Sequence, residues 1–457
     1  MSNKAGMKKI GRRKFIGTLS GAAALAGITS SFEYAKAAGA TVKDMTITNI
    51  YQTRLLNSGG RGGRGRPWAG IILRIETNKG IVGYGECRDL DRGAQALLNT
   101  LAPHLVGKNP TDIEAIFNTM LENYTPPPMN EMRDQEIRGT GAISGIEMAC
   151  WDIMGKAQNV PIYKLLGEKL YDRIPMYGDT DSNSEEDVVS RVKKGFRHYK
   201  CDMYLSNIAR GNYTTSDTPN NFGYREITVN QAGLDQMHEY MAKYREVLES
   251  FGEPFASAPI GSDHYQGYNA TNQLSIESAV ALAETLNEDH NPNGYVEDIV
   301  DWWCDDCSGR PSKAVADATD MRVQTGEDMF SFEQFKPWAD TRALDNFHPE
   351  PNTFGGINQT LIAAKYAAEK GINNYYHNSS GPIAMAGYLH LAAVSPNFIA
   401  LEYHQMDVPW HDDVLDGLDR PWILNGTVAI PEGPGIGVTI NEEQFAAHGA
   451  SEWTKLI

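Results

Sequence analysis

The stretch that decides the fold reads PFASAPIGSD at residues 254–263, GYVE at 294–297, MRVQTGE at 321–327, NFHPE at 346–350, INNYYH at 372–377 and NFIALE at 397–402. Segments with the apolar spacing of helices lie between these runs, such as SIESAVALAETL at 275–286 and GPIAMAGYLHLAAV at 381–394. A buried strand, a polar residue at its carboxyl end and then a helix, repeated along the chain, is typical of a β/α-barrel. We therefore predict an α/β protein built on such a barrel.

The polar residues that end these six runs form a candidate site, and they are Asp263, Glu297, Glu327, Glu350, His377 and Glu402. The carboxyl ends of the strands of a β/α-barrel all face one mouth, so these side chains are expected to converge. Converging carboxylates repel one another unless a cation lies among them, and ligation by oxygen alone suits Mg²⁺. The pattern predicts a catalytic metal site.

Length and charge limit the class of protein. The 457 residues suffice for a barrel of about 250 residues and a second domain. The net charge of −17 argues against nucleic acid and against anionic lipid surfaces as partners. The five cysteines do not form a disulfide scaffold; the pair Cys304 and Cys307 can be either a small disulfide or two free thiols.

The first 37 residues have the features of a twin-arginine export signal. Arg12 and Arg13 precede a weakly apolar run at 15–29, and Ala35-Lys36-Ala37 offers a cleavage site. We expect residues 1–37 to be removed, and the mature protein to be periplasmic or otherwise exported. No other segment is long and apolar enough to span a bilayer, so no membrane association is expected after removal.

Two predicted strands, at 45–56 and 69–86, flank the glycine- and arginine-rich segment NSGGRGGRGRP at 57–67. This segment can be a surface linker. Alternatively, Arg61 and Arg64 bind an anionic substrate, because guanidinium groups match carboxylates.

A resemblance to a known family rests on GAISGIEMACWDIMGKAQ at 141–158, VPIYKLLG at 160–167, GIVGYGE at 80–86, FGGI at 354–357 and PEGPGIGV at 431–438. These motifs resemble the mandelate racemase and muconate lactonising branch of the enolase superfamily. The resemblance implies a modified (β/α)7β TIM-like barrel at 171–404. It also implies an α+β capping domain at 44–170, completed by 405–457, with two loops near 55–67 and 86–93 that select the substrate.

The resemblance also implies roles for the residues at the strand ends. Asp263, Glu297 and Glu327 match the metal ligands of the family, with Asp298 as an alternative to Glu297. His377 matches the general base, and Glu350 the acid that orients it, although the family has an aspartate there. The expected ion is Mg²⁺, and Mn²⁺ stays an alternative.

The remaining candidates depart from the family pattern. Lys200 matches the first lysine of a lysine-x-lysine motif, but Asp202 replaces the second, so the lysine base of a two-base racemase is missing. Glu402 matches an acid that hydrogen-bonds the developing enolate. His264 and Tyr265 follow the first ligand, and related dehydratases can carry a histidine two residues after this ligand that acts as the general acid; Tyr265 occupies that place and His264 precedes it.

These residues predict the removal of the proton next to a carboxylate, because Mg²⁺ with a histidine base is the chemistry described for this superfamily. With one clear base, the favoured reaction is dehydration of a sugar acid to a 2-keto-3-deoxy acid. The alternatives are an epimerase, racemase or cycloisomerase that uses the same enolate, and a binding protein without turnover. The expected partner is a small carboxylate substrate, and we expect a homo-oligomer.

Overall fold

The computed structural model describes residues 42–54, 70–88, 93–124, 140–180, 182–219, 225–264, 272–287, 294–300, 309–403, 410–448 and 450–457. The export signal, Arg61, Arg64, Tyr265, Cys304 and Cys307 lie outside these ranges. Within them, none of the helices is both long and apolar enough to cross a membrane.

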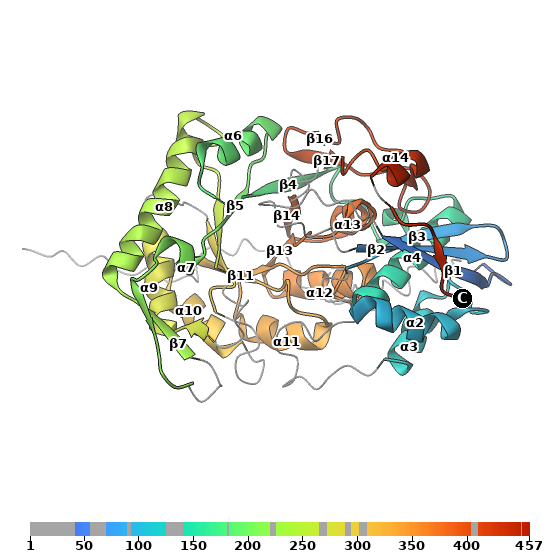
Figure 1. The fold of residues 1–457 in the computed structure, drawn as a ribbon, viewed down its shortest axis with the longest axis horizontal. Coiled ribbons are helices and arrows are strands. Elements are labelled where there is room, and N and C mark those ends of the chain that lie inside the picture. The colour runs from blue at the N-terminus through green and yellow to red at the C-terminus, as the bar shows by residue number, and fades with distance from the viewer. Residues whose placement is uncertain are drawn as a thin grey trace, which may run out of the picture.

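The amino-terminal part forms an antiparallel sheet with helices on it. Strands β1 (Ile47–Arg54), β2 (Gly70–Thr77) and β3 (Val82–Arg88) pair in sequence order, and β19 (Thr454–Lys455) from the end of the chain joins the edge of β1. Helices α2 (Gly93–Leu105), α3 (Ile113–Glu122), α4 (Thr140–Gln158) and the short α5 (Tyr163–Leu166) follow. This sheet lies at one end of the molecule, beside the carboxyl terminus (Figure 1).

A closed barrel of eight parallel strands forms the second part, and the predicted fold class is confirmed. In order around the barrel, the strands are β4 (Arg173–Thr180), β5 (Tyr199–Asp202), β8 (Ile260–Asp263), β10 (Tyr295–Glu297), β11 (Arg322–Thr325), β12 (Asn346–Phe347), β13 (Asn373–Tyr376) and β14 (Phe398–Tyr403). Strand β14 pairs with β4 in parallel, which closes the barrel.

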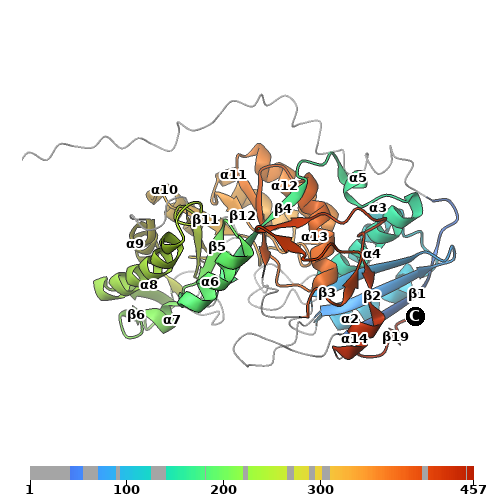
Figure 2. The same ribbon diagram turned by 90° about the horizontal axis from the view of Figure 1, so that it is seen from above.

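Among the described residues, seven helices of nine residues or more lie between the eight strands, one in each connection, as a (β/α)7β barrel requires. They are α6 (Glu185–Lys194), α8 (Gln231–Ser250), α9 (Ile276–Asn287), α10 (Arg310–Ala318), α11 (Phe332–Thr341), α12 (Ile357–Glu369) and α13 (Pro382–Val394). All thirteen residues of α13 are buried, because this helix packs against the barrel and against β3 and α4 of the amino-terminal part. The view in Figure 2 shows α13 between the barrel and that sheet.

Smaller elements extend both parts. Helix α7 (Leu205–Ile208) and the sheet of β6 (Tyr213–Thr215), β7 (Arg225–Val229) and β9 (Asn272–Leu274) lie on the side of α8 and α9, away from the amino-terminal sheet (Figure 1). After the barrel, β16 (Ile423–Leu424) and β17 (Thr427–Ala429) extend the sheet at β4, β15 (Leu415–Asp416) pairs with β18 (Thr439–Ile440), and α14 (Glu442–Ala447) follows. The exact domain limits given above stay a prediction.

Two buried carboxylates of the amino-terminal part contact helices of the barrel. Glu86 of β3 accepts hydrogen bonds from the backbone N–H groups of Gly381 and Ala384, at the start of α13. Glu147 of α4 accepts from Ile357 N and Asn358 N, at 2.9 Å each, at the start of α12. Because helix N-termini carry unpaired N–H groups and a partial positive charge, both acids serve as caps supplied by the neighbouring domain.

Another buried carboxylate, Asp152, holds the carboxyl-terminal segment against the amino-terminal part and explains the motif PEGPGIGV. Asp152 of α4 accepts hydrogen bonds from Tyr84 N of β3 at 2.8 Å and from Ile436 N at 2.9 Å. Gly435 beside it has a φ of +73°, and a Cβ there would lie 2.0 Å from Asp152 Oδ1. Only glycine therefore allows the carboxyl-terminal segment to approach α4 so closely.

Candidate active site

The six residues predicted from the strand ends all lie at the carboxyl ends of the barrel strands. Asp263 and Glu297 are the last residues of β8 and β10, and His377 directly follows β13. Glu327 and Glu350 lie in the segments after β11 and β12, and Glu402 is the last residue but one of β14. The closed barrel brings them to one mouth because its strands are parallel.

Lys200 of β5 lies among three of these acids. Its Nζ is 2.7 Å from Glu402 Oε1 and 3.2 Å from both Asp263 Oδ2 and Glu297 Oε1. Burial lowers the pKa of Lys200, but the charges of Glu297 and Glu402 outweigh this effect and raise the pKa well above its ordinary value. Lys200 is therefore a fixed cation, and it is poorly suited to remove a proton.

His377 and Glu350 form a hydrogen-bonded pair. His377 Nδ1 is 2.9 Å from Glu350 Oε2, which also accepts a hydrogen bond from Ser379 N at 3.0 Å. The other oxygen, Oε1, accepts from the hydroxyls of Ser380, at 3.2 Å, and Tyr388. Burial alone raises the pKa of Glu350, but the hydrogen bond and charge of His377 reverse this effect and leave the pKa below its usual value. Glu350 therefore stays ionised beside the imidazole.

The second nitrogen of His377 faces the acids of the mouth. Nε2 is 2.9 Å from Glu327 Oε2 and 3.5 Å from Glu402 Oε2. Burial lowers the pKa of His377, but the charges of Glu327 and Glu402 raise it well above 6.5. With Nδ1 fixed by Glu350, Nε2 is the atom that can exchange a proton with a molecule in the mouth.

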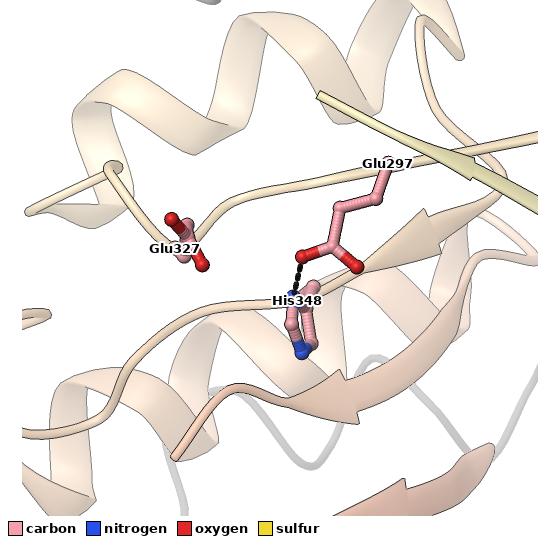
Figure 3. A group of neighbouring side chains, drawn as sticks. All are labelled: Glu297, Glu327 and His348. Carbon is pink, nitrogen blue, oxygen red and sulfur yellow. Dashed lines mark ion pairs between the residues drawn. The ribbon is translucent and has the colours of Figure 1, made fainter. Parts of the chain in front are cut away.

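A residue that sequence reasoning missed, His348, lies in the same cluster. It follows β12 directly and is completely buried. Its Nδ1 is 3.0 Å from Glu297 Oε1, and its Nε2 is 2.6 Å from the hydroxyl of Tyr177 on β4. Figure 3 shows the Glu297 carboxylate directed at the His348 ring, with the Glu327 carboxylate beside the pair. The signal for it in the sequence is the histidine of NFHPE, a second polar side chain after the same strand, two residues before Glu350.

The donor atoms of this cluster fit a divalent cation. One oxygen of Glu297, one of Glu327 and one nitrogen of His348 lie within 4.8 Å of one another, and Lys200 Nζ lies 3.2 Å from both Glu297 and Asp263. Asp298 adds another buried carboxyl group, which accepts a hydrogen bond from Thr325 Oγ1 at 2.6 Å. Burial raises the pKa of Asp298 well above 3.8, and the charges of Glu327 and Glu297 raise it further. Such an excess of buried carboxyl groups is the setting in which a bound cation stabilises a fold.

The last candidates from the strand ends have local partners. Asp202 Oδ2 accepts a hydrogen bond from Tyr204 at 3.0 Å and borders a cavity of about 330 Å³ between α7 and α8, lined also by Tyr240 and Lys243. His264 is completely buried, with Nε2 2.9 Å from Ser262 Oγ. Burial lowers the pKa of His264 to about 4, so this imidazole is neutral near pH 7.

An arginine of the amino-terminal part reaches the site. Arg88 ends β3, within the predicted substrate-selecting loop at 86–93, and its Nη1 is 3.9 Å from Glu350 Oε2. Burial lowers the pKa of Arg88, but the charges of Glu350 and Glu327 raise it above its ordinary value. A guanidinium group therefore faces the mouth from the cap, although Arg61, Arg64 and Tyr265 lie outside the described residues.

Comparison with known proteins gives consistent matches over most of the chain. The model of the mandelate racemase / muconate lactonizing enzyme N-terminal domain matches residues 68–167, and the enolase C-terminal domain-like model matches residues 185–444. A D-xylonate dehydratase from Haloferax volcanii is 27% identical over 412 residues, covering 89% of this chain and 90% of its own. A D-galactonate dehydratase family member from Salmonella virchow is 27% identical over 418 residues, covering 84% and 92%. A solved mandelate racemase/muconate lactonizing enzyme from Jannaschia sp. has the same fold, with a TM-score of 0.70 and 24% identity over 88% of this chain and 97% of its own.

Proposed function

The chain belongs to the mandelate racemase and muconate lactonizing enzyme family, and from this premise we propose that it dehydrates a sugar acid to a 2-keto-3-deoxy acid. The observation that carries the proposal is the position of His377. Its Nδ1 is held by Glu350, and its Nε2 is directed at the acid cluster of the mouth. Two relatives over most of this chain are named as dehydratases or dehydratase family members of sugar acids, D-xylonate and D-galactonate.

The proton next to a carboxylate is hard to remove because the product carries two negative charges. A divalent cation held by Glu297, Glu327 and Asp263 or His348 would stabilise that charge as a Lewis acid, a contribution of several kcal/mol. Lys200 lies within 3.2 Å of Asp263 and Glu297 and adds a fixed positive charge. Both features favour binding of the substrate carboxylate at the acid cluster, and Arg88 is placed to bind its hydroxyl groups.

In the proposed reaction, Nε2 of His377 takes the proton from the carbon next to the carboxylate while the ring is neutral, a state that a bound cation would favour by offsetting the charges of Glu327 and Glu402 that raise the pKa of His377. The hydroxyl group on the following carbon then leaves with a proton, so that one water molecule is lost, and the enol product rearranges to the 2-keto acid. The same imidazolium donates that proton in our proposal, because His264 is neutral near pH 7 and is bound to Ser262. No net proton is gained or lost by the protein.

Epimerisation is the runner-up, and it needs a second base on the opposite face of the substrate. Lys200 serves poorly as this base, since it is paired with Asp263, Glu297 and Glu402. Asp202 accepts a hydrogen bond from Tyr204 and borders the cavity beside α8. A single well-formed base therefore supports dehydration over epimerisation.

The test is to incubate the protein and a divalent cation with a panel of sugar acids, D-xylonate and D-galactonate included. We expect a 2-keto acid from at least one of them, and no product from His377→Asn. A matched control is His390→Asn, which removes another fully buried imidazole, one stacked on Tyr163 rather than placed in the mouth. Exchange of the α-proton in D₂O without keto acid would move the assignment to an epimerase. Ligand binding without either reaction, unchanged in His377→Asn, would indicate a binding protein.

We further propose that residues 1–37 direct export by the twin-arginine route, on the basis of Arg12, Arg13 and the Ala-Lys-Ala site. Fractionation of cells that express the full chain tests this, with Arg12→Lys and Arg13→Lys together as the blocking variant. Retention of the unaltered protein in the cytoplasm would contradict it. The homo-oligomer stays a prediction.

A further inference from the structure

The cavity between α7 and α8 is not used by the proposed reaction. Its volume of about 330 Å³ lies in the range of small-molecule pockets, about 300 to 1,000 Å³. It belongs to the connection from β5 to β8, which contains α7, β6 and β7 in addition to the barrel helix α8. Segments that follow the strands of a β/α-barrel commonly form its binding sites, so this cavity is a candidate for a ligand.

The most buried of the residues that line the cavity is an acid. Asp202, the last residue of β5, is 7% exposed. Its Oδ2 accepts a hydrogen bond from the hydroxyl of Tyr204 at 3.0 Å, so the carboxylate is held in place before a ligand binds. Asp202 also places the cavity beside the mouth, because it pairs in register with Asp263 of β8, and Met203 N donates to Asp263 O at 2.7 Å.

Exposed amide and ammonium groups line the same cavity. They belong to Asn207 of α7 and to Gln236 and Lys243 of α8. Gln236 Oε1 accepts a hydrogen bond from Asn212 at 2.9 Å, which leaves the amide nitrogen to donate. A carboxylate only accepts hydrogen bonds and an ammonium group only donates them, whereas an amide does both. The cavity therefore offers donors and acceptors within one volume.

The charges of the lining residues favour an uncharged ligand. Asp202 and Glu239 oppose an anion, and Lys243 opposes an organic cation. An apolar ligand would cover the charge of Asp202 without a hydrogen bond in return, which is costly. A sugar without a charge avoids these penalties, because its hydroxyl groups both donate and accept hydrogen bonds. The rings of Tyr204 and Tyr240 also line the cavity and supply apolar surface for the C–H groups of a sugar.

We propose that the cavity between α7 and α8 is a binding site for an uncharged sugar unit. The unit is either a free sugar or the second unit of a substrate whose acid unit lies in the mouth, since Asp202 and Asp263 end neighbouring strands. Only the second source rests on the proposed function. Binding of the sugar unit itself does not depend on turnover.

The experiment measures binding by saturation-transfer NMR and calorimetry, with D-xylose and D-galactose as free sugars. Asn207→Trp places a large ring at the exposed side of the cavity and should abolish sugar binding. Ser206→Trp is the matched control, because it adds the same ring to the neighbouring exposed position of α7, which does not line the cavity. Asp202→Asn should weaken sugar binding about tenfold, as the loss of a charge-assisted hydrogen bond does.

Xylobionate, in which a xylose unit is joined to D-xylonate, distinguishes the two sources of the sugar. If the unit is part of the substrate, xylobionate should bind the unaltered protein at least about tenfold more tightly than D-xylonate does, and Asn207→Trp should remove this difference. If the sugar is a free ligand, D-xylose binds and xylobionate gains nothing over D-xylonate. In either case, His377→Asn alters only the mouth and should leave the contribution of the xylose unit unchanged.

The proposal fails if neither free sugar binds and xylobionate binds no better than D-xylonate. It also fails if Asn207→Trp and Ser206→Trp bind the sugar alike, or if His377→Asn abolishes the binding of free sugar. If Asp202→Asn does not fold, the two exposed variants of α7 still decide the question. Failure of the proposed function would look different: sugar binding is then blocked in Asn207→Trp, and yet no sugar acid is dehydrated.

Discussion

Replacing Glu350 with glutamine tests whether this carboxylate sets the basicity of His377. Glutamine keeps the length of the side chain and one oxygen that can accept from Nδ1, which lies 2.9 Å from Glu350 Oε2. The charge is lost, and Ser379 N, Ser380 and Tyr388 then compete for a single acceptor oxygen. A hydrogen bond to a charged group contributes about 1.5 to 3 kcal/mol. At about 1.4 kcal/mol per pKa unit, the pKa of His377 should fall by about one to two units.

The pKa of His377 can be measured directly by NMR titration of metal-free protein with labelled histidine. His377→Asn assigns its resonance, and Glu147→Gln serves as a control, because Glu147 is equally buried but bonds to Trp151 and to the start of α12. The direction follows from electrostatics, since an anion beside an imidazole favours its protonated form. If His377 titrates at the same pH in folded Glu350→Gln as in the unaltered protein, Glu327 and Glu402 alone raise its pKa, and the effect on basicity assigned to Glu350 is wrong.

Three other predictions concern stability. Glu147→Ala leaves Ile357 N, Asn358 N and Trp151 Nε1 without their acceptor, so the free energy of unfolding, measured in urea, should fall by about 3 to 5 kcal/mol. Replacing the exposed Glu122 with alanine is the control and should change this free energy little. Burial raises the pKa of Glu86 from 4.5 to about 7, so the folded state holds this proton more tightly than the unfolded state does. The protonated Glu86 contributes fully to stability below about pH 4.5, and this contribution is lost as the pH rises to about 7. Urea unfolding compared across this range should show the free energy of unfolding fall by about 3 kcal/mol in the unaltered protein, and this fall should be absent in Glu86→Gln. Saturating Mn²⁺ should raise the melting temperature in calorimetry, and a chelator should reverse the rise, because the ion binds only the folded acid cluster; an unchanged melting temperature would contradict a metal site among these acids.

The barrel could be predicted from the sequence because its signal is local and repeated. Each strand is a short apolar run, and each helix between the strands has its own spacing of apolar residues. Once a β/α-barrel is inferred, parallel strands place all carboxyl ends at one mouth, so the convergence of Asp263, Glu297 and His377 follows without coordinates. The order of residues along the chain thus predicts their proximity in space.

Contacts between side chains from distant segments could not be predicted in this way. The distance between Lys200 and Glu402 depends on the rotamers of side chains from two separate strands, β5 and β14. The pairing of Lys200 with Asp263 likewise joins β5 to β8, and the sequence of neither strand predicts it. His348 was missed because the acid two residues later already completed the expected pattern. The approach of Arg88 to Glu350 depends on how the amino-terminal sheet packs on α13, which no local periodicity encodes.

The two imidazoles of the mouth show how their partners can divide the chemistry. The rings of His348 and His377 are 5.4 Å apart and perpendicular, and each has Nε2 within 4 Å of Glu402 Oε2. His377 is backed by the ionised Glu350, whose charge favours uptake of a proton. His348 is backed by the phenol of Tyr177, which fixes the ring but adds no charge. A carboxylate behind the first ring therefore suits a base that must accept a proton, whereas the partners of the second ring, Tyr177 and Glu297, hold it in place within the acid cluster. Tyr177 lies on β4 and Glu350 in the segment after β12, so the closure of the barrel gives the two histidines different partners.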